Sequence, residues 1–129
     1  MNLSNIGGPI AFQSRTAPDR TAIVHGRSAV TYRDLSNEIA KYAALFRSIG
    51  IEPGQRVAVF LENRPETVIA SLATGALGAI FVPINPLLKP AQVRYILAHS
   101  GSTCIVSSAA RLKILAPVLR EIGGDIHIV

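Results

Sequence analysis

Residues 78–101 constrain the fold of this chain more than any other segment. The segment opens with the apolar run 79–84, passes through a turn that Pro83 and Pro86 bracket, and continues from Pro90 as a helical pattern. Proline fixes its own φ angle and disfavours helix in the residue before it, so these prolines mark where a strand gives way to a helix. A buried strand followed directly by a helix predicts one crossover of a parallel sheet.

The rest of the second half repeats this alternation of strand and helix. Three further apolar runs have the length of strands, and the first of them is continuous, as in strands that are covered on both faces. They are residues 56–61, 103–106 and 126–129. With residues 79–84 as the second buried strand, the chain predicts an α/β fold: a parallel sheet with right-handed helical crossovers.

The connecting helices have recognisable starts. The first is expected from Asn63-Arg64-Pro65-Glu66 and the second from Pro90. Ser107 or Ser108 should cap the third helix, which Gly123-Gly124 should end. Pro117 lies inside that third helix and is expected to kink or split it.

A short helix and a hairpin are expected before the sheet. Residues 1–10 resemble a loose lead-in, and a helix should run from Ala11 to Ala17. Residues 21–24 and 29–31 predict a short hairpin. Thr31-Tyr32-Arg33-Asp34 then has the pattern of a helix N-terminus. The helix that follows has an apolar stripe at steps of three and four residues, and Gly50 can form its left-handed cap.

Composition excludes several classes of function. The 129 residues fit one domain, and the net charge of +5 comes from scattered basic residues, which does not predict a nucleic-acid surface. Residues 68–84 are uncharged, but they contain glycine, serine and proline and divide into a helix and a strand, so no membrane span is expected. The N-terminus lacks the pattern of a secretory signal and Cys104 is a lone cysteine, which together predict a cytoplasmic protein.

No residue pattern indicates catalysis by this chain. It contains neither a glycine-rich phosphate loop nor a G-x-S-x-G nucleophile motif. No histidine has a partner at metal-ligand spacing, and the acidic residues form no pair for acid–base work. Cys104, between apolar neighbours, is expected to be an inert buried thiol. These residues predict a scaffold with no catalytic residues and no metal site.

The order and spacing of four segments resemble a known family. They are TYRDL at 31–35, GIEPGQRVAV at 50–59, NRPE at 63–66 and GAIFVPINP at 78–86. From about Ile10 to Val129, the chain resembles the N-terminal part of the AMP-forming adenylating enzymes, which comprise acyl-CoA synthetases, peptide-synthetase adenylation domains and luciferases. Residues 85–93 and 107–112 resemble, more narrowly, the acyl-CoA ligases associated with bacterial exosortase gene clusters.

This resemblance implies an acid–CoA ligase. In such enzymes a carboxylate attacks the α-phosphate of ATP, with Mg²⁺ present, and coenzyme A then displaces AMP from the acyl-adenylate. The family's phosphate loop, acidic motifs and catalytic lysine lie further along the chain than residue 129. Residues 1–129 are therefore expected to be a single N-terminal subdomain, truncated before the ATP-binding motifs, that is inactive alone and binds none of these cofactors tightly. Its partners would be the remainder of the enzyme and a carboxylic acid substrate.

The resemblance assigns one candidate binding residue. Arg94 falls near a position that contacts the nucleotide phosphate of coenzyme A in some acyl-CoA synthetases, and a guanidinium can bind phosphate through two hydrogen bonds. The other interpretation is a solvated arginine on an exposed helix face.

A second interpretation of the whole chain is a free-standing α/β module that binds a partner or small molecule without catalysis. The two interpretations predict different exposed surfaces. A subdomain whose sheet normally continues into a neighbour should expose apolar area and an unpaired strand edge, and should therefore self-associate. A free-standing module should be monomeric.

Overall fold

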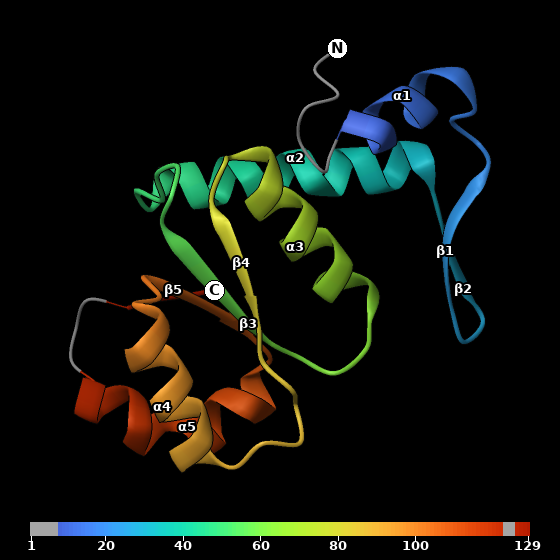
Figure 1. Cartoon of the computed structure of the whole chain (residues 1–129). Helices are drawn as coiled ribbons and strands as arrows, with labels where there is room; N and C mark the ends of the chain where they lie inside the picture. Colours follow the sequence, from blue (N-terminus) through green and yellow to red (C-terminus); the bar gives the residue numbers. More distant parts are fainter. Residues whose placement is uncertain (1–7, 123–125) are drawn as a thin grey trace.

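The apolar runs of the sequence form one parallel sheet in the computed structural model, which describes residues 8–122 and 126–129 (Figure 1). The strands of this sheet lie in the order β4-β3-β5-β6. They are β3 (Arg56–Phe60), β4 (Ile80–Pro83), β5 (Cys104–Ser107) and β6 (His127–Ile128). The helices are α1 (Gly8–Thr16), α2 (Tyr32–Ser48), α3 (Pro65–Ala76), α4 (Pro90–Ser100) and α5 (Ala109–Ile122). The predicted α/β fold, with its parallel sheet and helical crossovers, is confirmed.

Helices cover both faces of the sheet. Along β3, the side chains of Val57 and Val59 pack into one core with α2 and α3, whereas Ala58 and Phe60 pack into a second core with α4 and α5. This alternation follows from the period of two residues in a strand. The step from β3 to β4 and the step from β4 to β5 run in opposite directions, and their helices lie on opposite faces, so both crossovers have the same hand.

Strand β4 is less buried than its apolar sequence predicts. It pairs with β3 alone, within the described residues, and none of its side chains is fully buried. Ile80 is 45% exposed. Pro83 suits this edge position because it has no N–H group to donate to a further strand. The prediction of a second buried strand at 79–84 is therefore correct in place, but within that range only Ile84, directly after β4, is buried.

The segment before the sheet confirms the predicted hairpin. Strands β1 (Thr21–His25) and β2 (Ser28–Thr31) pair antiparallel. The hydroxyl oxygen of Thr31 accepts a hydrogen bond from the amide of Asp34 at 3.2 Å, which caps α2 as expected. Gly50 adopts a φ of 89°, the left-handed conformation predicted after this helix.

Two helices differ from their predicted bounds. Helix α1 begins at Gly8 rather than Ala11, since Pro9 has a φ angle suited to a first helical turn, so the predicted lead-in is wrong for residues 8–10. Helix α5 continues through Pro117 as one element, so of the two predicted effects the split is wrong and the kink stays a prediction. Burial of Leu115 and Val118 on either side of the proline offsets the hydrogen bond that proline cannot donate. The predicted stop at Gly123-Gly124 lies outside the described residues.

The uncharged run at 68–84 is divided between α3, a loop and β4, as expected. Among the helices of residues 8–122, none combines the length and the apolar character needed to span a membrane.

Candidate functional site

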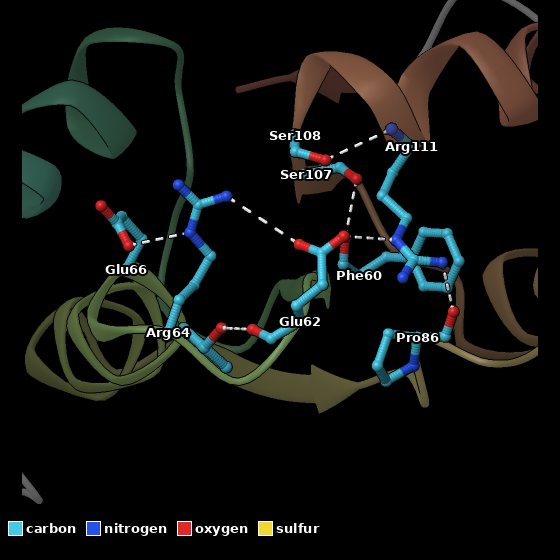
Figure 2. A network of polar contacts seen from close by, with 9 residues as sticks. Phe60, Glu62, Arg64, Glu66, Pro86, Ser107, Ser108 and Arg111 are labelled. Atoms are coloured by element: carbon cyan, nitrogen blue, oxygen red, sulfur yellow. Dashed lines mark hydrogen bonds and ion pairs between the residues drawn. The ribbon is translucent and has the colours of Figure 1, made fainter. Parts of the chain in front are cut away.

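Polar side chains gather where β3, β4 and β5 end. Carboxyl ends of parallel strands meet at one edge of a sheet, and this is where open α/β sheets bind their ligands. Glu62 and Arg64 follow β3, Pro86 follows β4, and Ser108 and Arg111 follow β5. Figure 2 shows these residues facing one another across the edge. We refer to Glu62, Arg64, Glu66 and Arg111 as the edge network.

Arg111, at the start of α5, makes the largest number of contacts in the edge network. Its Nε atom donates to Oε1 of Glu62 at 2.7 Å, and its Nη1 atom donates to the backbone carbonyl of Pro86. The guanidinium carbon lies 5.4 Å from the centre of the Phe60 ring, at cation–π distance. The amide of Arg111 donates to the hydroxyl of Ser108 at 3.2 Å, so Ser108 is a helix cap as predicted.

Arg64 continues the network toward α3. Its Nε atom donates to Oε2 of Glu66 at 3.0 Å, and its Nη1 atom lies 3.9 Å from Oε2 of Glu62. The hydroxyl of Thr67 donates to the backbone carbonyl of Glu62 at 2.8 Å, which fixes the turn into α3. Positive and negative side chains thus alternate along the edge in the order Arg111, Glu62, Arg64, Glu66 (Figure 2).

These contacts shift the acidity of both carboxylates. The hydrogen bond from the Arg111 side chain is the main reason that the pKa of Glu62 lies below its ordinary value. A backbone hydrogen bond is the main reason that the pKa of Glu66 is lowered, and Arg64 adds to this shift. Both carboxylates are therefore ionised and paired at neutral pH, and the lowered pKa makes each a weaker proton acceptor than an ordinary glutamate.

The paired state of Glu62 predicts an acid-dependent loss of stability. Because the pKa of Glu62 is lower in the folded state, its stabilising effect is complete above the ordinary pKa of 4.5 and is lost as pH falls through the folded-state pKa. We expect Glu62→Gln to flatten the pH dependence of the unfolding free energy below pH ~4.5, measured by urea titration. Glu52→Gln, outside the edge network, is the control and should leave that dependence unchanged. Equal effects of the two variants would contradict the role of Glu62.

Two hollows adjoin the edge network. One, of about 430 Å³, lies between the hairpin, α2 and the start of α3, and His25, Asp34 and Glu38 are among its lining residues. The other, of about 260 Å³, lies beside Ser107, Ser108 and Val129. Tyr42, Arg64 and Glu66 line both. Burial is the main cause of the raised pKa of Tyr42, so its phenol is neutral at physiological pH.

Arg94, the binding residue that the resemblance implies, lies apart from the edge network. It is on α4, where its Nε atom is 3.0 Å from Oε2 of Glu121 on α5, and both side chains are more than half exposed. Its position on an exposed helix face is compatible with both interpretations of this residue.

The remaining candidate residues behave largely as predicted. Cys104 is fully buried, as predicted, and burial raises its thiol pKa to about 12, which disfavours the reactive thiolate. Ser107 is not a cap: its hydroxyl donates to the carbonyl of Phe60 at 2.7 Å and joins β5 to β3. In residues 8–122 and 126–129, no group of three or more His, Cys, Asp or Glu residues could hold a metal ion.

The fold and this edge define an α/β domain whose parallel sheet is covered on both faces and whose polar side chains gather at the carboxyl ends of the strands. Residues 10–128 match the family described as AMP-binding enzyme. The chain belongs to the AMP-binding enzyme family, which confirms the resemblance drawn from its segment order.

Relatives in this family act on different acids. The chain is 35% identical over 104 residues to the feruloyl-CoA synthase of an Amycolatopsis species, which covers 81% of this chain and 21% of that protein. It is 39% identical over 95 residues to the crotonobetaine/carnitine–CoA ligase of Salmonella paratyphi B, which covers 74% of this chain and 18% of that protein. The chain thus spans about a fifth of the length of these curated relatives.

Solved structures also support membership of this family. The N-terminal subdomain of NpsA from Klebsiella oxytoca, in complex with anthranilyl-AMSN, matches with a TM-score of 0.82 and 25% identity, covering 97% of this chain and 30% of that one. A benzoate CoA ligase from Burkholderia xenovorans shares the fold, with a TM-score of 0.88 at 23% identity over 98% of this chain and 25% of that one. The fold is that of the N-terminal subdomain of adenylating enzymes.

Proposed function

We propose that this chain is the N-terminal portion of an AMP-forming acid–CoA ligase, with residues 1–129 as a single subdomain that precedes the ATP-binding motifs. The observation that supports this proposal is the family match over residues 10–128 in a chain that spans about a fifth of its CoA-ligase relatives. The complete enzyme would activate a carboxylic acid with ATP and Mg²⁺ and transfer the acyl group to coenzyme A. We also propose a cytoplasmic location, with which the free, buried Cys104 is consistent.

The residues of this portion do not by themselves fit ATP or its Mg²⁺ ion. The guanidinium groups of the edge network are already paired with Glu62 and Glu66, and the described residues contain no cluster that could hold a metal. No step of the reaction is therefore assigned to the edge network. In the proposed enzyme, this portion supplies the sheet, its ordered edge and one side chain for coenzyme A.

That side chain is Arg94, for which we propose a contact with a phosphate of coenzyme A. Exposed ion pairs such as Arg94–Glu121 contribute only about 0–1 kcal/mol, so the guanidinium can leave Glu121 for a phosphate at little cost. We expect Arg94→Ala in the complete enzyme to raise the KM for coenzyme A about tenfold or more, the loss expected for a charge-assisted hydrogen bond. The KM values for ATP and for the acid should stay unchanged.

Arg120→Ala is the matched control for Arg94, since Arg120 is an exposed arginine on α5. Its KM for coenzyme A should equal that of the unmodified enzyme. An unchanged KM in Arg94→Ala, or the same rise in both variants, would remove the assignment and leave Arg94 as a solvated surface residue.

The gene offers the most direct test of the proposed function. An open reading frame that continues past codon 129 into a glycine- and threonine-rich phosphate loop is the expected result. The enzyme from that frame should exchange pyrophosphate into ATP in the presence of its acid, and residues 1–129 alone should not. A stop codon directly after codon 129 would overturn the proposal and favour a free-standing module.

The proposal also implies that the isolated chain self-associates. Ile80 on edge strand β4 and Ile128 on β6, the other outer strand of this sheet, are 45% and 54% exposed. Both would be covered if the sheet continued into a neighbouring subdomain. Sedimentation velocity at rising concentration should show oligomers. A concentration-independent monomer would instead support a free-standing module.

A further inference from the structure

One side chain joins three segments that are far apart in the sequence. Arg111 extends from the first turn of α5 and reaches the ring of Phe60 in β3, the carboxylate of Glu62 after β3, and the carbonyl of Pro86 after β4 (Figure 2). Only 23% of its side chain is exposed. A guanidinium can serve all three partners because its in-plane donors bind the two oxygens while its flat face lies over the Phe60 ring, whereas an ammonium is a single point.

The connection between β4 and α4, residues 84–89, depends on this side chain at its middle. At the start of the connection, the amide of Ile84 donates to the carbonyl of Val59. The hydrogen bonds of Leu87 and Leu88 are local, since both amides donate to oxygens of Asn85. Leu87 is 84% exposed and so is not held by burial. Leu88 packs against the second core at the end of the connection. The bond from Arg111 to Pro86 therefore ties the middle of the connection, between Ile84 and Leu88, to the rest of the domain.

We propose that Arg111 is a positioning residue: it sets the position of residues 84–89 and, through them, of the N-terminus of α4. Glu62 neutralises the guanidinium and holds it in place, so Arg111 acts on the protein chain and does not bind a substrate phosphate. Since α4 begins at Pro90 and carries Arg94, the role in coenzyme A binding rests on the proposed function. The role in ordering the connection does not.

Hydrogen exchange on the 129-residue chain, resolved by NMR at a concentration below that at which it self-associates, tests the ordering role. In Arg111→Met, the amides of Leu87 and Leu88 should exchange about tenfold faster, because a hydrogen bond to a charged group is lost from the connection. The amide of Ile84 should not change. Lys113→Met, an exposed cation on the same helix, is the control and should leave all these rates unchanged.

Three further variants separate positioning from general support of the fold. Arg111→Lys should restore little protection, because an ammonium cannot reach Glu62 and Pro86 with the same geometry. Glu62→Gln keeps an acceptor and should retain most of the protection, whereas Glu62→Ala should lose it. Equal acceleration at Ile84 and at Leu87, or no acceleration in Arg111→Met, would overturn the proposal. If Arg111→Met fails to fold, the difference in protection between Glu62→Gln and Glu62→Ala tests the same ordering role.

In the complete enzyme, Arg111→Lys should raise the KM for coenzyme A several-fold with kcat at saturating coenzyme A unchanged. If this KM is unchanged while hydrogen exchange in residues 84–89 is altered as expected, Arg111 orders the connection but does not affect coenzyme A binding. If the unmodified enzyme forms no coenzyme A thioester, the proposed function is wrong. The ordering role would then be decided by the hydrogen-exchange result.

Discussion

Phe46→Ala is expected to lower the free energy of unfolding by about 3–5 kcal/mol, the range for removing a buried aromatic ring. Phe46 is fully buried on α2, in the core that this helix shares with α3 and the sheet. The rings of Phe46 and Tyr42 meet edge to face, with their centres 6.3 Å apart. The substitution loses this contact and leaves a cavity in the layer that attaches α2 to the sheet.

The neighbouring residue Leu45 provides the control, since it lies on the same helix and is 42% exposed. Leu45→Ala should change the unfolding free energy by less than about 1 kcal/mol, because a surface position loses little burial. Urea titrations of the two variants measure both values. Similar losses in Phe46→Ala and Leu45→Ala would mean that α2 does not pack on the sheet as described.

The parts of the fold that depend on local patterns were predictable from the sequence. The stripe through Leu35, Ile39, Ala43 and Phe46 has the helical period, and these are the buried residues of α2. Burial of β4 was not predictable, because an apolar strand at the edge of a sheet has the same composition as a central one. Only the strand order, which depends on the whole chain, distinguishes the two.

The edge network was missed for a related reason. Glu62 and Arg111 are separated by 49 positions, and neither belongs to a motif. A pattern of paired acidic residues does not reveal a carboxylate such as Glu62, whose partner is an arginine. One signal was available: each residue follows the end of an apolar strand, and such ends meet at one edge of a parallel sheet. Arg94 came from family resemblance alone, and no local pattern distinguishes it from other surface arginines.

Val57→Asp is expected to destabilise the domain by about 4 kcal/mol or more at neutral pH, because an unpaired charge would be buried. Val57 is fully buried in β3, with Phe81 of β4 and Cys104 of β5 as its register partners. It packs in a core of buried hydrophobic side chains. Burial would raise the pKa of the new carboxyl above its unfolded value of about 3.9, so the loss should grow as pH rises from 4 to 7.

Ile80→Asp is the control for position within the sheet. Ile80 is 45% exposed on edge strand β4, and its register partner on β3 is Arg56. A carboxylate there stays hydrated beside a cation, so the change in unfolding free energy should be within about 1 kcal/mol and nearly independent of pH. Urea titrations at pH 4 and pH 7 compare the two variants. If Ile80→Asp were as damaging as Val57→Asp, β4 would not be the open edge of the sheet, because an aspartate is tolerated only where water reaches it.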